Sequence, residues 1–216
     1  MTAAIDRLDT EAGRLLFARE CRFVAGATNE EILPPPTLPE VAFAGRSNVG
    51  KSSLVNALTG HRTLARVSNT PGRTQQINFF DLGGRLMLVD LPGFGFAKVS
   101  KTRVRGWTGL IFRYLRGRPT LRRVCLLVDA RHGLKEVDRE FMEQLDTAAV
   151  SYQVLLTKAD KLKPAELEER HADVAREIAG HVAAHPDIVA TSAQTGAGIP
   201  SVRAHLAALA EPAAIQ

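Results

Sequence analysis

The chain has 216 residues, of which 45% are apolar and 24% are charged, and its net charge at pH 7 is +5. This size allows one substantial core in one globular domain. The two cysteines, Cys21 and Cys125, are far apart and have no C-x-x-C spacing, which argues against a disulfide framework and a zinc–cysteine cluster. Charged residues interrupt the N-terminal segment and no later apolar run reaches membrane-spanning length, so we expect a cytoplasmic protein without a signal peptide or membrane span.

The N-terminal region is expected to form a helix over about residues 9–19, followed by a connector. The prolines of "ILPPPTLPE" favour an extended backbone there. A last helix is predicted near Ile199–Ala210. The predicted division is an N-terminal helix and Pro-rich extension (1–39), one main domain (40–211) and a C-terminal tail (212–216).

Short apolar and β-branched runs alternate with longer segments of helical period. The runs are "VAFAG", "QINFFDL", "RLMLVDLPG", "RVCLLVDA", "YQVLLTKAD" and "DIVATSA". This pattern predicts an α/β fold with helices on both faces of the sheet. Only Gly83 and Gly84 separate the second and third runs, so that pair should be antiparallel. We therefore predict a mostly parallel six-stranded sheet with one antiparallel edge strand.

The segment "GRSNVGKS", Gly45 to Ser52, matches G-x-x-x-x-G-K-[ST] between a strand and a helical run. Gly45 and Gly50 let the backbone N–H groups face phosphate oxygens, and Lys51 neutralises the β and γ oxygens. The Ser52 hydroxyl is placed to bind Mg²⁺ directly. This motif predicts a P-loop.

A second phosphate element is "DLPG", in which Asp90 can hold a Mg²⁺-bound water and the Gly93 N–H can reach the γ-phosphate. Phe94 follows, where many GTPases carry a water-orienting Gln. In the preceding "SNTPGRTQQ", either Thr70 or Thr74 could supply a second hydroxyl to Mg²⁺. Thr74 is preferred because it stands just before a strand, and an ordinary Pro-Gly turn is the alternative.

The segment "TKAD", Thr157 to Asp160, follows an apolar strand. The Asp160 carboxylate can accept guanine N1–H and the 2-amino group, whereas adenine would leave it unpaired. The Lys158 stem can lie across the base. In "TSAQTG", backbone N–H groups near Ser192 and Ala193 could reach guanine O6.

Nine Lys or Arg residues and no acid lie between Leu91 and Val128. In "TRVRGWTGLIFRYLRGR" apolar residues recur at helical spacing, with cations on the other side. We predict a cationic surface that adjoins the switch and can contact the phosphate backbone of a nucleic acid, although a solvated helix face is the alternative. It comprises Lys98, Lys101, Arg103, Arg105, Arg113, Arg116, Arg118, Arg122 and Arg123.

The order GRSNVGKS, PGRT, DLPG, TKAD and TSA resembles that of the TRAFAC-class GTPases. "FAGRSNVGKSSLVNAL", "TPGRTQQINFF" and "DLPGFGFAKVSK" are similar to the EngB (YsxC/YihA) ribosome-biogenesis GTP-binding proteins. The resemblance covers most of the chain and makes residues 40–211 a GTPase domain. It implies GTP and Mg²⁺ binding, a slow GTPase cycle and a role in large ribosomal subunit assembly, in which the cationic surface would bind ribosomal RNA. It also implies a link to bacterial cell division and septation. Many GTPases carry Asn where Thr157 stands.

Asn48 resembles the Asn with which several related GTPases hold K⁺, and a cation there could replace part of an arginine finger's effect. An Asn48 that stabilises its own loop is the alternative. The predicted catalytic residues are Lys51, Thr74 and Asn48. The predicted GTP-binding residues are Gly45, Arg46, Ser47, Asn48, Val49, Gly50, Lys51, Ser52, Ser53, Gly72, Arg73, Thr74, Gln75, Gln76, Asp90, Leu91, Pro92, Gly93, Thr157, Lys158, Ala159, Asp160, Thr191, Ser192 and Ala193.

Two other functions stay open on the sequence, a scaffold that binds GTP without useful hydrolysis and a P-loop phosphotransferase that acts on a small molecule. The second would need a substrate hydroxyl site and a base that the sequence does not offer. His181 and His185 stand four residues apart on a predicted helix, but no acid completes a zincin pattern, so metal binding is not expected there. A monomer is predicted.

Overall fold

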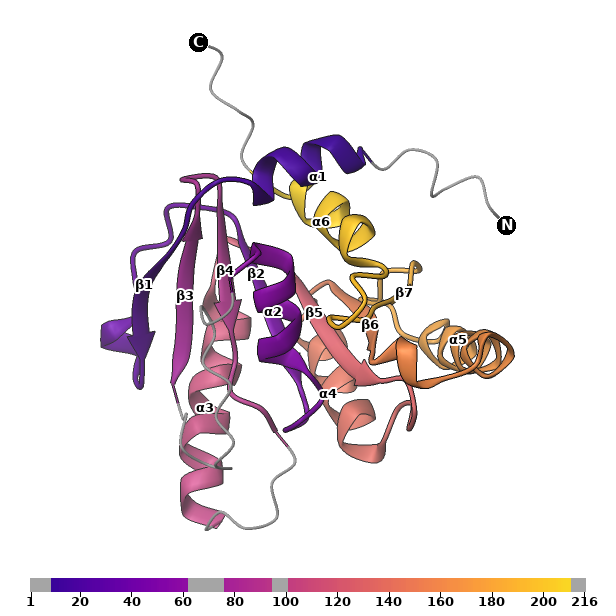
Figure 1. Cartoon of the computed structure of the whole chain (residues 1–216). Helices are drawn as coiled ribbons and strands as arrows, with labels where there is room; N and C mark the ends of the chain where they lie inside the picture. The colour runs from indigo at the N-terminus through magenta and orange to yellow at the C-terminus, as the bar shows by residue number, and fades with distance from the viewer. Residues whose placement is uncertain (1–8, 62–75, 95–100, 211–216) are drawn as a thin grey trace.

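The computed structural model describes residues 9–61, 76–94 and 101–210, with the backbone alone for 101–108 (Figure 1). Its helices are α1 (Thr10–Phe17), α2 (Lys51–Thr59), α3 (Lys101–Gly117), α4 (Glu136–Thr147), α5 (Pro164–Ile178) and α6 (Ile199–Ala207). Its strands are β1 (Cys21–Ala27), β2 (Glu40–Gly45), β3 (Ile77–Leu82), β4 (Leu86–Asp90), β5 (Leu121–Asp129), β6 (Tyr152–Thr157) and β7 (Val189–Ala190). Short 3₁₀ turns are η2 (Glu30–Ile32) and η3 (Ala159–Lys161).

Within these residues the strands form one seven-stranded sheet in the order β1-β3-β4-β2-β5-β6-β7. β3 is antiparallel to both of its neighbours, β1 and β4, whereas β2, β4, β5, β6 and β7 pair in parallel. The α/β class and the antiparallel hairpin at Gly83-Gly84 are therefore confirmed.

The predicted number of six strands is wrong by one. The additional strand, β1, was assigned to the N-terminal extension, and it places the reversed strand β3 second from the edge. "CRFVAGA" gives little strand signal, because its exposure does not alternate regularly and its register with β3 shifts between Phe23 and Ala25.

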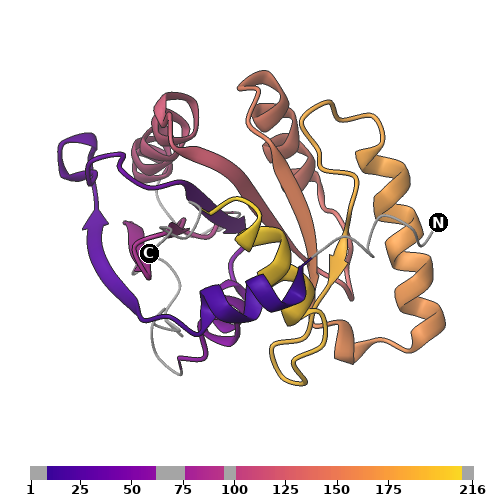
Figure 2. The same cartoon turned by 90° about the horizontal axis from the view of Figure 1, so that it is seen from above.

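Helices cover both faces of the sheet, as predicted (Figures 1 and 2). One core packs α3, α4 and α5 against side chains such as Phe79, Val89 and Leu126. The other packs α1, α2 and α6 against side chains such as Phe43, Leu88 and Leu127. Because consecutive side chains of a strand point to opposite faces, buried strands covered on both sides are apolar along their whole length.

The N-terminal helix α1 is part of this structure. Asp9 caps it by accepting a hydrogen bond from the Ala12 N–H at 2.8 Å. Figures 1 and 2 show α1 lying beside α6. The two backbones approach so closely that a Cβ on Gly13 would lie 2.7 Å from the Ala204 nitrogen.

Two smaller expectations can also be compared with the structure. His181 and His185 do not lie on a helix, because α5 ends at Ile178 and the chain turns before β7. No helix of the described ranges is long and apolar enough to cross a membrane.

Candidate nucleotide-binding site

The predicted P-loop connects the end of β2 to the start of α2. A Cβ on Gly45 would lie 2.8 Å from the Leu127 carbonyl oxygen of β5, so only glycine allows this close approach. Gly50, at the N-cap of α2, has φ 104°, and Asn48 has φ 63°. Both are left-handed conformations that glycine and asparagine adopt most readily. These conformations let the chain turn from β2 into the N-terminus of α2, an end of the helix that favours anions.

Lys51 and Asp90 bring the P-loop and the "DLPG" segment together. Their side chains form a direct ion pair, and only 12% and 11% of them are exposed. Ser52 lies beside Lys51 in the first turn of α2. A hydroxyl and a carboxylate next to an anion-binding helix end are oxygen donors of the kind that Mg²⁺ prefers, so these residues fit that ion.

Phe94 pairs with the backbone of the P-loop just after β2, and its ring packs against the core. Its N–H donates to the Gly45 carbonyl at 3.2 Å, and its carbonyl accepts from the Ser47 N–H at 3.1 Å. Its ring stacks on Phe141 of α4, with 4.9 Å between ring centroids. The residue in the position of the water-orienting Gln thus fastens the switch to the P-loop and to α4.

The Arg46 side chain joins the P-loop to α4. Its guanidinium turns to α4 and pairs with Asp138, with 3.0 Å between Nε and Oδ2. The Asp138 side chain is fully buried, and this burial raises the pKa of its carboxyl although Arg46 and a backbone hydrogen bond oppose the shift. The sequence analysis missed Asp138, which lies in an ordinary helical segment.

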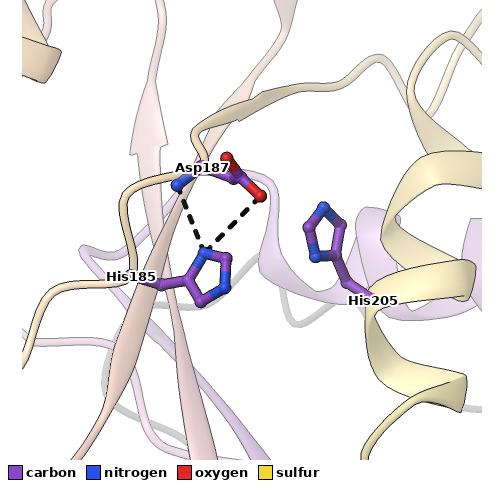
Figure 3. Close-up of side chains that lie close together, drawn as sticks. All are labelled: His185, Asp187 and His205. Carbon is purple, nitrogen blue, oxygen red and sulfur yellow. Dashed lines mark hydrogen bonds and ion pairs between the residues drawn. The ribbon is translucent and has the colours of Figure 1, made fainter. Parts of the chain in front are cut away.

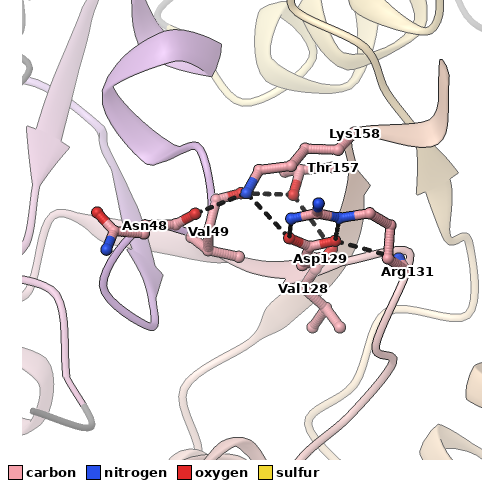
Figure 4. A network of polar contacts seen from close by, with 7 residues as sticks. All are labelled: Asn48, Val49, Val128, Asp129, Arg131, Thr157 and Lys158. Atoms are coloured by element: carbon pink, nitrogen blue, oxygen red, sulfur yellow. Dashed lines mark hydrogen bonds and ion pairs between the residues drawn. The ribbon is translucent and has the colours of Figure 1, made fainter. Parts of the chain in front are cut away.

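The base-binding segment "TKAD" is fastened to the P-loop by two hydrogen bonds (Figure 4). The buried Thr157 hydroxyl donates to the Val49 carbonyl at 2.6 Å, and the Lys158 ammonium donates to the Asn48 carbonyl at 2.7 Å. Thr157 therefore performs an anchoring role with a hydroxyl. Figure 4 shows the side-chain amide of Asn48 directed away from this network. Within the part of the chain that the structure describes, that amide makes no hydrogen bond, which gives no support to a loop-stabilising role.

Asp129, at the end of β5, is a second residue that the sequence analysis missed. Its carboxylate accepts hydrogen bonds from Lys158 at 2.9 Å and from Arg131 at 2.7 Å. Burial alone would raise the pKa of this carboxyl, but the hydrogen bonds from Arg131 and Lys158 hold it well below its usual range. A strand that ends in Asp beside a predicted "TKAD" strand was the available signal.

Asp160 and Ser192 join the two base-binding loops. The Ser192 hydroxyl donates to the Asp160 carboxylate at 2.6 Å, and this hydrogen bond, with another from Lys161, lowers the pKa of that carboxyl. The Ser192 N–H donates to the Ala197 carbonyl, so it is not available to guanine O6 as predicted. The exposed Ala193 N–H has no hydrogen bond among the described residues, which leaves it as the candidate donor.

Some predicted residues lie outside the described residues, and for them the structure gives no position. These are Thr70, Gly72, Arg73, Thr74 and Gln75. Gln76 lies just before β3, and its side-chain amide donates to Asn78 at 2.9 Å.

Comparison with known proteins supports the interpretation of this site as a guanine-nucleotide site. Residues 40–158 match the family described as 50S ribosome-binding GTPase, and residues 114–212 match the elongation factor Tu GTP-binding domain. The "Probable GTP-binding protein EngB" of Rhodospirillum rubrum is 63% identical over 207 residues, which are 94% of this chain and 90% of that protein. The chain belongs to the EngB family of GTP-binding proteins. The EngB protein of Hyphomonas neptunium is 58% identical over 203 residues, 93% of this chain and 92% of the relative.

Solved structures agree with this EngB assignment. The crystal structure of a probable GTP-binding protein engB superposes with a TM-score of 0.64 at 25% identity, covering 79% of this chain and 97% of that one. Era, solved with MgGDPNP and a segment of 16S ribosomal RNA, has a TM-score of 0.64 at 21% identity and shares the fold. That Era match covers 82% of this chain and 58% of that one. The family assignment implies GTP or GDP binding and GTP hydrolysis.

Among the described residues of this EngB chain, the basic block does not form the single surface predicted. The Arg118 side chain is 7% exposed, pairs with the buried Glu40 at 2.6 Å and lies over the Phe79 ring. Arg123 is half-buried and contacts Gln153. Arg113 is exposed but pairs with Glu30 of η2 at 2.5 Å. These acids lie outside the block in sequence, so the run of cations alone could not reveal them.

The remaining cations are also divided in space. Arg116 and Arg122 are exposed and have no ion pair within the ranges described. Arg122 lies at the start of β5, about 23 Å along the strand from Asp129 at the nucleotide end. Only the N-terminal part of α3 follows the switch segment directly. The positions of Lys98 and of the Lys101, Arg103 and Arg105 side chains lie outside the described residues.

Proposed function

We propose that this EngB protein is a GTP-binding and slowly GTP-hydrolysing switch that assists assembly of the large ribosomal subunit. The observation that carries the proposal is the direct Lys51–Asp90 ion pair. It connects the residue expected to contact the β and γ phosphates to the segment expected to respond to the γ-phosphate. A change at the phosphate is thereby transmitted to the chain that leads into α3.

Guanine specificity rests on Asp160, which Ser192 and Lys161 hold ionised. An ionised carboxylate accepts both N–H groups on the guanine edge. Adenine offers no such pair of donors, so ATP would leave this acceptor unsatisfied. The Ala193 N–H completes the proposed contacts at O6.

For the phosphates, we propose Ser52 and Thr74 as direct Mg²⁺ ligands and Asp90 as a ligand through water. Mg²⁺ would neutralise charge that develops on the phosphate oxygens. Lys51 and the P-loop N–H groups orient the triphosphate. The exposed Asn48 amide is proposed to hold K⁺ beside the phosphates, because oxygen ligands near an anion suit a monovalent cation.

Hydrolysis by the isolated protein should be slow. Phe94 is packed on Phe141, and an apolar ring in that position cannot orient an attacking water. Stimulation must then come from K⁺ or from the ribosomal partner. The non-hydrolysing scaffold remains the second candidate, and the packing of Phe94 is the observation in its favour.

The proposed partner is ribosomal RNA of the large subunit, as the description of the matching family suggests. The exposed Arg113 and Arg116 of α3, together with the cations that precede them, are its proposed contacts. Phosphate contacts of this kind weaken with added salt. We further propose a cytoplasmic monomer whose loss disturbs cell division and septation through defective ribosome assembly.

Co-sedimentation with purified large ribosomal subunits tests this function. We expect tighter association with a non-hydrolysable GTP analogue than with GDP or no nucleotide, and loss of association as salt increases. Arg116→Glu should weaken it, whereas Arg176→Glu on the exposed side of α5 serves as the matched control. Equal association in all nucleotide states would refute the switch.

A further inference from the structure

A cluster of three side chains lies at the end of the sheet opposite the nucleotide site. His185 and Asp187 belong to the segment between α5 and β7, and His205 belongs to α6. One potential ligand atom of each lies within 4.8 Å of the others. Figure 3 shows the two imidazoles and the carboxylate facing a common space.

The backbone around this cluster is held firmly. The His185 N–H donates to the Tyr152 carbonyl at 2.6 Å, and the Gln153 side chain donates to the Asp187 carbonyl at 3.0 Å. On the other side, Arg203 of α6 donates to the Leu58 carbonyl of α2 at 2.9 Å. The three potential metal ligands thus lie on two segments, and each segment is held in place by its own hydrogen bonds. This arrangement favours a preorganised site.

From this geometry we propose that His185, Asp187 and His205 bind one divalent transition-metal ion, with Zn²⁺ as the ion to test first. Two imidazole nitrogens and one carboxylate oxygen are ligands of the kinds that Zn²⁺ takes, and three protein ligands leave a fourth position for water. Ligand atoms around tetrahedral Zn²⁺ lie about 3.3 Å apart, so distances within the cluster must shorten by at most about 1.5 Å. Rotation of the partly exposed Asp187 side chain can bring its carboxylate closer to the imidazoles, and rotation of the rings themselves must supply the rest.

The surrounding charge selects the type of ion. Asp187 is the only carboxylate in the cluster, and the guanidinium of Arg123 opposes a cation nearby. A site with one acid suits neither Mg²⁺ nor Ca²⁺, which need several oxygen ligands. We therefore expect the site to prefer transition-metal ions, which bind imidazole well.

An ion bound at His185 would compete with one hydrogen bond inside the cluster. The Asp187 N–H donates to the His185 Nδ1 at 3.2 Å, so an ion bound at Nδ1 would replace this bond. The buried thiols of Cys21 and Cys125 do not compete, because burial raises the pKa of each to about 12.

A bound ion would tie the segment before β7 to α6, and through Arg203 to α2. This is a stabilising cross-link that goes beyond the proposed switch function. It should raise the thermal midpoint, because a ligand that binds only the folded state stabilises it. It should leave nucleotide affinity unchanged, since none of its residues lies in the nucleotide site.

Calorimetric titration of the full-length, tag-free chain saturated with GDP and Mg²⁺ tests the proposal, with Zn²⁺ as the probe. We expect one Zn²⁺ per chain and a higher thermal midpoint, and Co²⁺ should give the strong visible absorption of a tetrahedral site. Asp187→Asn and His185→Gln should each weaken Zn²⁺ binding about tenfold or more.

His181→Gln is the matched control, because His181 is a neighbouring histidine that pairs instead with Asp146 at 2.6 Å. His205→Gln adds a third test if circular dichroism shows that this variant folds. If it does not fold, Asp187→Asn and His185→Gln alone decide whether the proposal holds. Absence of Zn²⁺ binding, an unchanged affinity in Asp187→Asn and His185→Gln, or an equal loss in the control would overturn the proposal.

Discussion

The two ends of the sheet use the same ion-pair chemistry in different ways. At the strand starts, Glu40 is 1% exposed and accepts hydrogen bonds from Tyr114, Arg118 and Thr120. At the nucleotide end, Lys51 pairs with Asp90 and Lys158 pairs with Asp129, and the two lysine side chains remain 12% and 30% exposed.

This difference separates charges that stabilise the fold from charges that a ligand can reach. Both carboxylate oxygens of Glu40 accept hydrogen bonds from neighbouring side chains, and the residue is buried, so a molecule from solution cannot reach it. The lysines of the other end lie where phosphates and a base are expected to bind. The five predictions below test this contrast, beginning with the largest effect.

Glu40→Ala should be the most damaging change, because it leaves the buried Arg118 without its acid. Removing one partner of a buried pair costs about 3–5 kcal/mol of unfolding free energy. For a chain of this size, the expected decrease in Tm is about 10 °C. Urea unfolding and a thermal melt measure both, and Glu30→Ala, which breaks the exposed pair with Arg113, should cost less than about 1 kcal/mol. Similar costs for the two variants would contradict the contrast.

Lys51→Ala should reduce GTP hydrolysis by about 100-fold or more, because it removes the cation that neutralises phosphate oxygens. Its effect on Tm should be much smaller than that of Glu40→Ala. Phosphate release under saturating GTP measures the change, with Lys163→Ala as an exposed control. Unaltered hydrolysis in Lys51→Ala would show that the P-loop is not the reactive site.

Asp160→Asn should weaken GTP binding by about 10- to 100-fold, because an amide cannot accept both guanine N–H groups. The same variant should favour xanthosine triphosphate, whose C2 carbonyl accepts from an amide N–H. Competition binding with both nucleotides measures the ratio. An equal loss of affinity for both would mean that Asp160 does not contact the base.

Thr157→Val should destabilise the protein by about 1–2 kcal/mol, because the buried Val49 carbonyl loses its donor. Since this bond joins "TKAD" to the P-loop, GTP affinity should also fall severalfold. Thr157→Asn, which restores a donor, should recover most of the affinity in a fluorescent-nucleotide titration. If Val and Asn behave alike, the hydroxyl is not the anchor.

Asp129→Asn should give the smallest effect, about 1 kcal/mol or less at pH 7. The folded-state pKa of Asp129 lies below its unfolded value of about 3.9, so its stabilising contribution is present above that pH and is lost as the pH falls further. The difference in urea midpoint between the wild type and the variant should therefore stay constant from pH 7 to about pH 4 and shrink as the pH is lowered further toward about 2. A difference that shrinks already above about pH 5, or that does not shrink below pH 4, would contradict the assigned pairing with Lys158 and Arg131.

The sequence was sufficient for the elements whose signal is local. Six apolar runs, the P-loop glycines and the order of Lys51, Asp90 and Asp160 predict the fold and the arrangement of the site, because parallel strands place their carboxyl ends at one edge. The edge strand β1 was missed since a half-exposed, bulged strand carries little periodicity.

What could not be predicted depends on contacts between distant residues. Glu40 and Arg118 are 78 positions apart, so the sequence gives no sign that this arginine of the basic block is buried. The cluster of His185, Asp187 and His205 likewise forms only when α6 packs beside the segment that precedes β7. Such pairings follow from tertiary packing, which a local pattern does not encode.

The most direct test of the central claim is GTP hydrolysis in potassium and in sodium buffer, each with and without purified large ribosomal subunits. If Asn48 holds K⁺ and the ribosome is the partner, subunits should stimulate hydrolysis, more strongly in potassium, and Asn48→Ala should remove the potassium effect. Bound GTP with no stimulation in any buffer would contradict the hydrolytic switch and favour a GTP-dependent scaffold.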